Sequence, residues 1–285
     1  MQFCRKLNVP PLPVHDSIPL LYVTHLYMKG LAPVTISVHL AAIRALHILA
    51  GCKVPVLRTP QVNLALKGMK QHYVVRARHP IDFQLLHRMY VQLLGTKREK
   101  LWKAVLCLAF FAGLRSAEYA TTGSCKARFP TVGSLKFKES VPPSVQFTVS
   151  QSKTCPQGFT VPVGCTGHEV CAYCSLLKYR QYRQDKGSWV VGTPLFRHRG
   201  VALSAALVNE KIKALVQALG IDSTGYSSHS LRIGAATTAA TSGFADWELQ
   251  RLGGWKSQCY KQYVRARDSH IAGFAARMTS QDPTS

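Results

Sequence analysis

The stretch AVLCLAFFAGLRSAE (104–118) places the longest apolar run of the chain directly before an arginine and a glutamate. Its apolar part, Ala104 to Leu114, is too short to span a bilayer and predicts a buried helix, which we expect to extend over 97–120. A charge in such apolar surroundings is costly unless it is paired. Arg115 and Glu118 are three residues apart, so on a helix they share a face. The stretch therefore predicts a globular core with a paired arginine attached to it.

The charge of the chain points to the class of its partner. The 285 residues contain 36 lysines and arginines against 13 acids, a formal net charge of +23. Such an excess favours a polyanionic partner, with nucleic acid as the leading candidate and a merely basic soluble protein as the alternative. The hydrophobic fraction of 47% is that of a folded globular protein.

The cysteine count and the start of the chain indicate the cellular compartment in which the protein is expected. There are nine cysteines, an odd number, and the start MQFCRKLNVPP has no apolar core of the length a signal peptide needs. We therefore expect a reduced, intracellular environment and no membrane segment.

The first part of the chain predicts a helical domain over 1–79. Apolar residues recur at helical spacing over 18–50, with a break between Gly30 and Pro33, which predicts a helical hairpin. A further helix is expected to begin at Thr59-Pro60, an N-cap followed by a first-turn proline. This helix carries two lysines one turn apart, and the basic segment 74–82 that follows contains two arginines. The candidate DNA contacts are Lys67, Lys70, Arg76 and Arg78.

The second part predicts a mixed α+β domain over 80–285, mainly helical with a small β-sheet. Two helices are expected before residue 120 and a mainly helical segment from Leu176 onward. Between them, the β-rich runs of 144–163 flank a Gly/Pro turn and predict a hairpin with Lys153 near its turn.

Three separated fragments resemble the tyrosine recombinase family, that is, the phage-integrase or Cre-like enzymes. They are AGLRSAE (112–118), HSLR (229–232) and LGGW (252–255), the last followed by two tyrosines. The family pattern has an arginine in G-L-R-x-x-E, a lysine on a β-hairpin, H-x-x-R, a histidine or tryptophan after L-G or G-G, and a nucleophilic tyrosine near the C-terminus. All five elements occur here in that order. The tail YKQYVR and the SKT at Lys153 are most similar to recombinases of eukaryotic mobile elements, such as DIRS-like retrotransposons and Cryptons.

The resemblance implies a role for each matching residue. Attack on a phosphodiester creates a five-coordinate phosphorus whose negative charge needs fixed donors, and two arginines offer planar forks to its oxygens. By resemblance, the lysine protonates the departing 5′-oxygen, the histidine does acid/base or phosphate-binding work, and the tryptophan donates its indole N–H. The implied catalytic residues are Arg115, Lys153, His229, Arg232, Trp255 and Tyr263, with Glu118 in support.

Two tyrosines compete for the role of nucleophile. The family nucleophile commonly lies nine residues after the His/Trp position. Tyr263 lies eight residues after Trp255 and precedes Val264-Arg265, whereas Tyr260 lies only five after it. We expect Tyr263 to attack and Tyr260 to pack, although on a helix the two would be one turn apart.

The resemblance further implies two domains that form a clamp around double-stranded DNA, a homo-tetramer in the synaptic complex, no cofactor for catalysis, and a nuclear location. It implies a site-specific recombinase or integrase of a mobile element that works through a covalent 3′-phosphotyrosyl intermediate. Two alternatives stay open: a domesticated, catalytically silent DNA-binding protein, and DNA relaxation of the type IB topoisomerase kind.

One motif departs from the family pattern. Cys165-x2-His168-x2-Cys171-x2-Cys174 contains ligand types that can hold a structural zinc ion. Free cysteines on a turn that leads into a helix are the alternative.

Overall fold

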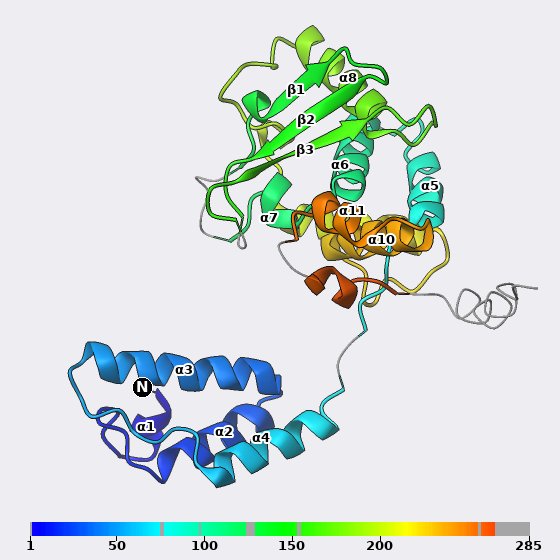
Figure 1. Cartoon of the computed structure of the whole chain (residues 1–285). Coiled ribbons are helices and arrows are strands. Elements are labelled where there is room, and N and C mark those ends of the chain that lie inside the picture. The colour runs from blue at the N-terminus through cyan, green and yellow to red at the C-terminus, as the bar shows by residue number, and fades with distance from the viewer. Residues whose placement is uncertain are drawn as a thin grey trace, which may run out of the picture. The chain divides into compact units, whose positions relative to one another are not determined.

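The computed structural model describes residues 2–74, 77–96, 98–123, 129–152, 155–255 and 258–265. The chain divides into two compact units, Met1–Arg76 (unit 1) and Ala77–Ser285 (unit 2), which are drawn in Figure 1. Within the described part, no helix has the length and apolar character needed to cross a membrane.

Unit 1 is helical. Its elements are α1 (Gln2–Lys6), α2 (Ile18–Met28), α3 (Pro33–Leu49) and α4 (Pro60–His72). The predicted hairpin is confirmed, because α2 ends before Gly30, which has a φ of +80°, and α3 begins at Pro33. The predicted start of α4 is also confirmed: the side chain of Thr59 accepts a hydrogen bond from the backbone N–H of Val62 at 3.3 Å.

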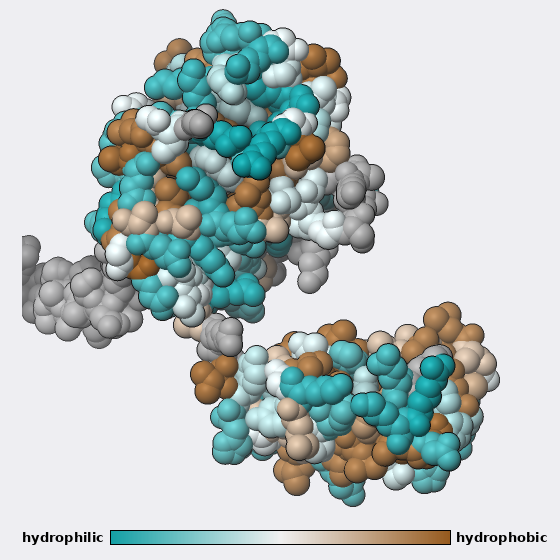
Figure 2. Space-filling model, turned by 180° about the vertical axis from the view of Figure 1, so that it is seen from behind, coloured by the Kyte–Doolittle hydropathy of each residue, from teal (hydrophilic) through white to brown (hydrophobic). Residues whose placement is uncertain are grey.

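Apolar side chains from α2, α3 and α4 form the core of unit 1. The buried members are Val23, Leu26, Ile36, Leu40, Val62 and Leu66. Other apolar side chains of this unit face solvent, and Figure 2 shows brown, hydrophobic residues on its surface. The solvent-exposed apolar residues of α3 include Val34, Val38, Ile48 and Leu49.

Unit 2 packs helices against a small antiparallel sheet. Its helices are α5 (Phe83–Val91), α6 (Glu99–Phe111), α7 (Ser116–Tyr119), α8 (Ala172–Asp185), α9 (Ala205–Ala218), α10 (Ser228–Thr241) and α11 (Asp246–Leu252), with 3-10 turns η1 (Val132–Ser134) and η2 (Gln258–Gln262). The strands are β1 (Leu135–Lys138), β2 (Ser144–Val149) and β3 (Phe159–Gly164), in the order β1-β2-β3, and a separate pair β4 (Arg197–His198) and β5 (Val201–Ala202).

The sheet pairs in a register that directs alternate side chains to the core. Phe147 of β2 lies opposite Leu135 on one side and Val161 on the other, and all three are buried. The hairpin predicted over 144–163 is confirmed as β2 and β3, while β1 and the β4–β5 pair were not predicted. These strands are short, and β4 and β5 have two residues each, too few for a period of two to be visible.

Helix α6 is the centre of unit 2, and every residue from Leu101 to Phe110 is buried. The sheet lies on one side of α6, and α10 crosses near its C-terminal end (Figure 1). The prediction of one helix over 97–120 was wrong: α6 ends at Phe111, and Gly113 adopts a φ of +55° before the short α7 begins at Ser116. Glycine takes this left-handed conformation without the steric cost that a side chain would add.

Helix α10 lies against the segment that precedes α5. The backbone N–H of Ile81 donates to the carbonyl of Ser230 at 3.0 Å. A Cβ added to Gly234 would collide with the carbonyl group of Ile81, whereas one added to Gly68 on α4 would meet nothing within 4 Å. The absence of a side chain at Gly234 therefore permits this close backbone approach.

We expect Gly234→Ala to lower the free energy of unfolding of unit 2 by about 1–3 kcal/mol, the usual cost of overpacking a core. The matched change Gly68→Ala, also inside a helix, should instead stabilise unit 1 by about 0.5–1 kcal/mol, because alanine is the better helix former. Urea unfolding of both variants measures the two values. Equal effects of the two substitutions would contradict the close contact at Gly234.

Candidate active site

Arg232 is the most deeply placed charged group of the site. It projects from α10 and has no exposed surface. Its Nη1 donates to the carbonyl of Gly113, and its Nη2 donates to the carbonyl of Gly253 at 2.9 Å. Its guanidinium carbon lies 4.2 Å from the ring centre of Trp255. Desolvation, followed by the nearby charge of Arg115, lowers the pKa of Arg232 to about 10, so the group stays a cation at neutral pH.

Arg115 is held by the first turn of α7. Its backbone N–H donates to Oε2 of Glu118 at 2.7 Å, and its Nη1 donates to Oε1 of the same carboxylate at 3.0 Å. The Glu118 side chain is only 2% exposed, while that of Arg115 is 20% exposed. The carboxylate thus both caps the helix and fixes the arginine, leaving part of the guanidinium open to solvent.

A cavity of about 550 Å³ opens beside Arg115. Its wall includes Glu118 and residues 148–152 at the end of β2. Nη1 of Arg115 lies 3.5 Å from Oγ of Ser152, so the β2–β3 connection reaches this arginine. The predicted catalytic residue Lys153 follows directly but lies outside the described residues, as does Arg76.

His229 lies on the first turn of α10, three residues before Arg232. Burial, and then the positive charges of Arg78, Arg232 and Arg115, lower its pKa to about 4. The imidazole is therefore neutral at pH 7. Arg78 is exposed, and its effect on His229 places it near the cluster.

Tyr263 and Trp255 complete the cluster. The ring of Tyr263 lies 5.3 Å from that of His229 and 5.6 Å from that of Trp255, measured between centroids. The guanidinium carbon of Arg232 lies 5.5 Å from the Tyr263 ring centre. Tyr263 is half-buried, whereas Trp255 is 4% exposed.

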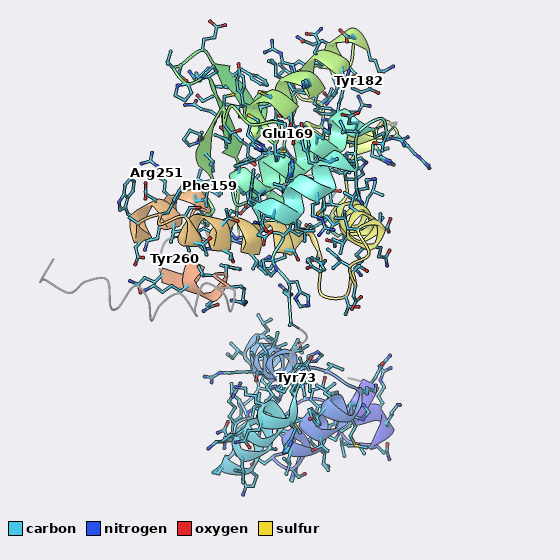
Figure 3. All side chains as sticks on the ribbon, turned by 90° about the vertical axis from the view of Figure 1, so that its right-hand side faces the viewer. Tyr73, Phe159, Glu169, Tyr182, Arg251 and Tyr260 are labelled. Atoms are coloured by element: carbon cyan, nitrogen blue, oxygen red, sulfur yellow. The ribbon has the colours of Figure 1, made fainter. Side chains whose placement is uncertain are left out.

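Tyr260 occupies a different environment, although it lies in η2, only three residues before Tyr263. It is 1% exposed and packs with Ala236, Ala239 and Leu249 behind the site (Figure 3 labels it). The carboxylate of Asp246, and then burial, raise its pKa to about 12, which disfavours the phenolate.

The structure therefore brings together six of the predicted residues: Arg115, Glu118, His229, Arg232, Trp255 and Tyr263. The predicted DNA contacts Lys67 and Lys70 are exposed on α4 in unit 1. Sequence reasoning missed the two carbonyls that hold Arg232 and the role of Asp246 beside Tyr260. The two carbonyls could not be predicted from residue types, because the atoms that accept from Arg232 are backbone oxygens of glycines.

No protein-family model matches the sequence, and no curated protein matches it. Solved structures do match. The XerH site-specific recombinase bound to a palindromic difH substrate superposes with a TM-score of 0.63 at 13% identity, covering 94% of this chain and 73% of that one. The Tn1549 transposon integrase in complex with circular intermediate DNA gives 0.64 at 15% identity, covering 97% and 91%.

A lambda integrase dimer bound to a COC′ core site gives a TM-score of 0.57 at 17% identity, covering 90% of this chain and 66% of that one. The chain has the tyrosine-recombinase fold. The predicted fold class, mainly helical with a small sheet in the catalytic domain, is thereby confirmed. At these identities the likeness concerns the fold alone.

The lowered pKa of His229 makes stability depend on pH. Its pKa is about 4 in the folded chain against 6.5 for an ordinary histidine, so below pH 6.5 the unfolded chain binds more protons and stability falls as pH falls. Allowing for its partial exposure, we expect about 1 kcal/mol less stability at pH 5 than at pH 7 from this group.

Denaturant unfolding of wild type and His229→Gln at both pH values measures this contribution, which the variant should lack. His72→Gln, at an exposed position on α4, is the matched control. An unchanged pH dependence in His229→Gln would contradict the assignment.

Proposed function

We propose that this chain is a DNA strand transferase of the tyrosine recombinase type, which cuts and rejoins double-stranded DNA through a covalent 3′-phosphotyrosyl intermediate. The observation that carries the proposal is the convergence of Arg115, Arg232, His229, Trp255 and Tyr263 at one place in unit 2. This set can serve a metal-free attack on a phosphodiester: the phenol can act as nucleophile, the neutral imidazole as base, and the two cations and the indole N–H as donors to the phosphoryl oxygens.

The chemistry follows from where these groups lie. The Tyr263 oxygen attacks the phosphorus, the bond from phosphorus to the 5′-oxygen breaks, and the phosphotyrosyl ester keeps the strand end attached to the protein. His229, neutral at pH 7, accepts the phenolic proton. The negative charge that develops on the phosphoryl oxygens is met by Arg115 and Arg232. The departing 5′-oxygen needs a proton, which the resemblance assigns to Lys153.

Two buried donors support a phosphate at this place. Nε of Arg232 and Nε1 of Trp255 are buried, and neither has a hydrogen-bond partner among the described residues. A buried donor left unpaired costs about 1–3 kcal/mol. A phosphate oxygen within hydrogen-bonding distance of either group would give that group the partner it lacks, so these donors favour an anion at this place.

The proposed DNA contacts, assembly and location of the enzyme rest on its charge and on the family resemblance. The net charge of +23 suits contacts along a DNA backbone from both units, with Lys67 and Lys70 on α4 and Arg76 and Arg78 between the units in sequence. By resemblance, the two units form a clamp on DNA, four copies assemble in the synaptic complex, and the enzyme serves a eukaryotic mobile element in the nucleus. Catalysis then needs neither metal nor nucleotide cofactor.

The choice of nucleophile is tested by two matched substitutions. We expect Tyr263→Phe to abolish the covalent protein–DNA adduct, because it removes the only phenol at the arginine pair among the described residues, while Tyr260→Phe keeps it. The assay incubates each variant with supercoiled plasmid carrying candidate sites, in buffer without Mg²⁺, and maps the adduct by peptide sequencing. An adduct retained by Tyr263→Phe and lost by Tyr260→Phe would reverse the assignment.

The same assay separates the alternatives. Binding without any adduct in the wild-type chain indicates a catalytically silent DNA-binding protein. An adduct with relaxed plasmid but no exchanged strands indicates an activity of the type IB topoisomerase kind. Exchange between two sites supports the recombinase.

Binding should depend strongly on salt. With six or more phosphate contacts, the affinity for duplex DNA should fall by about 10³ or more between 50 and 200 mM salt. Charge reversal at Lys67 and Lys70 should weaken binding, yet leave adduct formation intact at saturating DNA, because unit 2 holds the reacting groups. Fluorescence anisotropy over a salt titration measures both, and a flat curve would refute the electrostatic contacts.

A further inference from the structure

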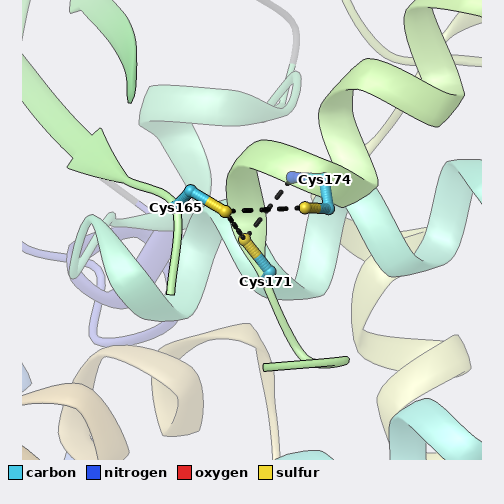
Figure 4. A group of neighbouring side chains, drawn as sticks. All are labelled: Cys165, Cys171 and Cys174. Carbon is cyan, nitrogen blue, oxygen red and sulfur yellow. Dashed lines mark hydrogen bonds between the residues drawn. The ribbon is translucent and has the colours of Figure 1, made fainter. Parts of the chain in front are cut away.

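Three cysteines bring their sulfur atoms together between the end of β3 and the start of α8 (Figure 4). The Sγ atom of Cys165 lies 3.7 Å from that of Cys174 and 3.8 Å from that of Cys171, and all three lie within 4.8 Å of one another. The cluster is remote in sequence from Arg232 and Tyr263 and has no part in the reaction proposed above.

The spacing of these sulfurs is that of a metal site and not of a disulfide. Zinc binds thiolate at about 2.3 Å in tetrahedral geometry, which places neighbouring sulfurs about 3.8 Å apart. A disulfide would need an S–S bond of about 2.05 Å. All three cysteines are free thiols, and two of the three sulfur separations match the edge of the tetrahedron.

The backbone around Cys171 is arranged to stabilise a thiolate. Cys171 is the N-cap of α8, and its sulfur accepts the backbone N–H groups of Thr166 at 3.4 Å and Cys174 at 3.5 Å. Peptide donors and the positive end of a 14-residue helix both favour negative charge on this sulfur. Such N–H···S contacts also orient a sulfur for a metal ion.

His168, the fourth residue of the sequence motif, is held elsewhere. Its Nδ1 accepts the backbone N–H of Val170 at 3.0 Å. Its ring packs against Phe83 at 5.4 Å and against His87 at 5.6 Å, measured between centroids. Among the described residues, the group of close ligand atoms contains the three cysteines only.

We propose that Cys165, Cys171 and Cys174 bind a Zn²⁺ ion as three thiolates, with water as the fourth ligand. The ion joins two elements that the chain otherwise connects by seven residues, 165–171: Cys165 directly follows β3, Cys171 is the N-cap of α8, and Cys174 lies in its first turn. Because β3 pairs with β2 and α8 packs on α6, the ion fastens the edge of the sheet to the helical core of unit 2.

The test uses the full chain, reduced and stripped of metal, and titrates it with Co²⁺, which reports thiolate ligands through its charge-transfer absorbance. We expect saturation at about one Co²⁺ per chain, displacement of the band by Zn²⁺, and a rise in Tm of the wild-type chain with Zn²⁺. A reduced wild-type chain that gives no thiolate band would overturn the proposal, whatever the variants do.

Variants define the ligand set. Cys165→Ser and Cys174→Ser should each weaken Co²⁺ binding by at least about tenfold and abolish the Zn²⁺-dependent rise in Tm. Cys52→Ser in unit 1 is the matched control and should bind as wild type does. His168→Ala should also retain the metal. Metal loss in His168→Ala, or equal loss in Cys52→Ser and Cys174→Ser, would overturn the three-thiolate site.

Discussion

The arrangement of the candidate site in unit 2 depends on one buried guanidinium, that of Arg232. Arg232 has no exposed surface, and a cation in such a place is costly unless hydrogen bonds offset its desolvation. The bonds go to the carbonyls of Gly113 and Gly253, which belong to the ends of α6 and α11. The face of the guanidinium lies against Trp255. One side chain thus joins α10 to two loops, and each of those loops leads directly into another residue of the candidate site.

The loops have glycines at the points of contact because a side chain would not fit. A Cβ on Gly113 would lie 3.3 Å from the Cα of Gly253, and a Cβ on Gly253 would collide with the Trp255 ring. The absence of side chains at both glycines therefore favours the convergence of their carbonyls on Arg232. Two residues beyond Gly113, the chain presents Arg115, and two beyond Gly253 it presents Trp255. The hydrogen bonds from Arg232 to the two glycine carbonyls therefore help to position both Arg115 and Trp255.

The sequence predicted those features of the fold and site that depend on residues close together in the chain. The pairing of Arg115 with Glu118 followed from a separation of three residues, and the α2–α3 break followed from Gly30 and Pro33. The break between α6 and α7 was missed, because a glycine within an apolar helical pattern is compatible with a continuous helix. At this break Gly113 adopts a left-handed conformation, and its carbonyl accepts a hydrogen bond from Arg232, 119 residues away in sequence, a contact that no residue type indicates. The proximity of β2 to Arg115 through Ser152 is likewise a product of tertiary packing.

The covering of Arg232 bears on how a phosphate would approach it in the proposed reaction. The guanidinium has no exposed surface, and the rings of Trp255 and Tyr263 both lie over it. Trp255 is 4% exposed and lies in a buried cluster with Ala236 and Leu249, so its displacement would disrupt that packing. Tyr263 is half-buried and follows a single 3-10 turn, and its carbonyl accepts a hydrogen bond from Oγ1 of Thr237 at 3.3 Å. Of the two rings that lie over Arg232, the one proposed to carry the attacking oxygen is therefore the more exposed, so in the proposed reaction the phosphate approaches Arg232 from the side of Tyr263.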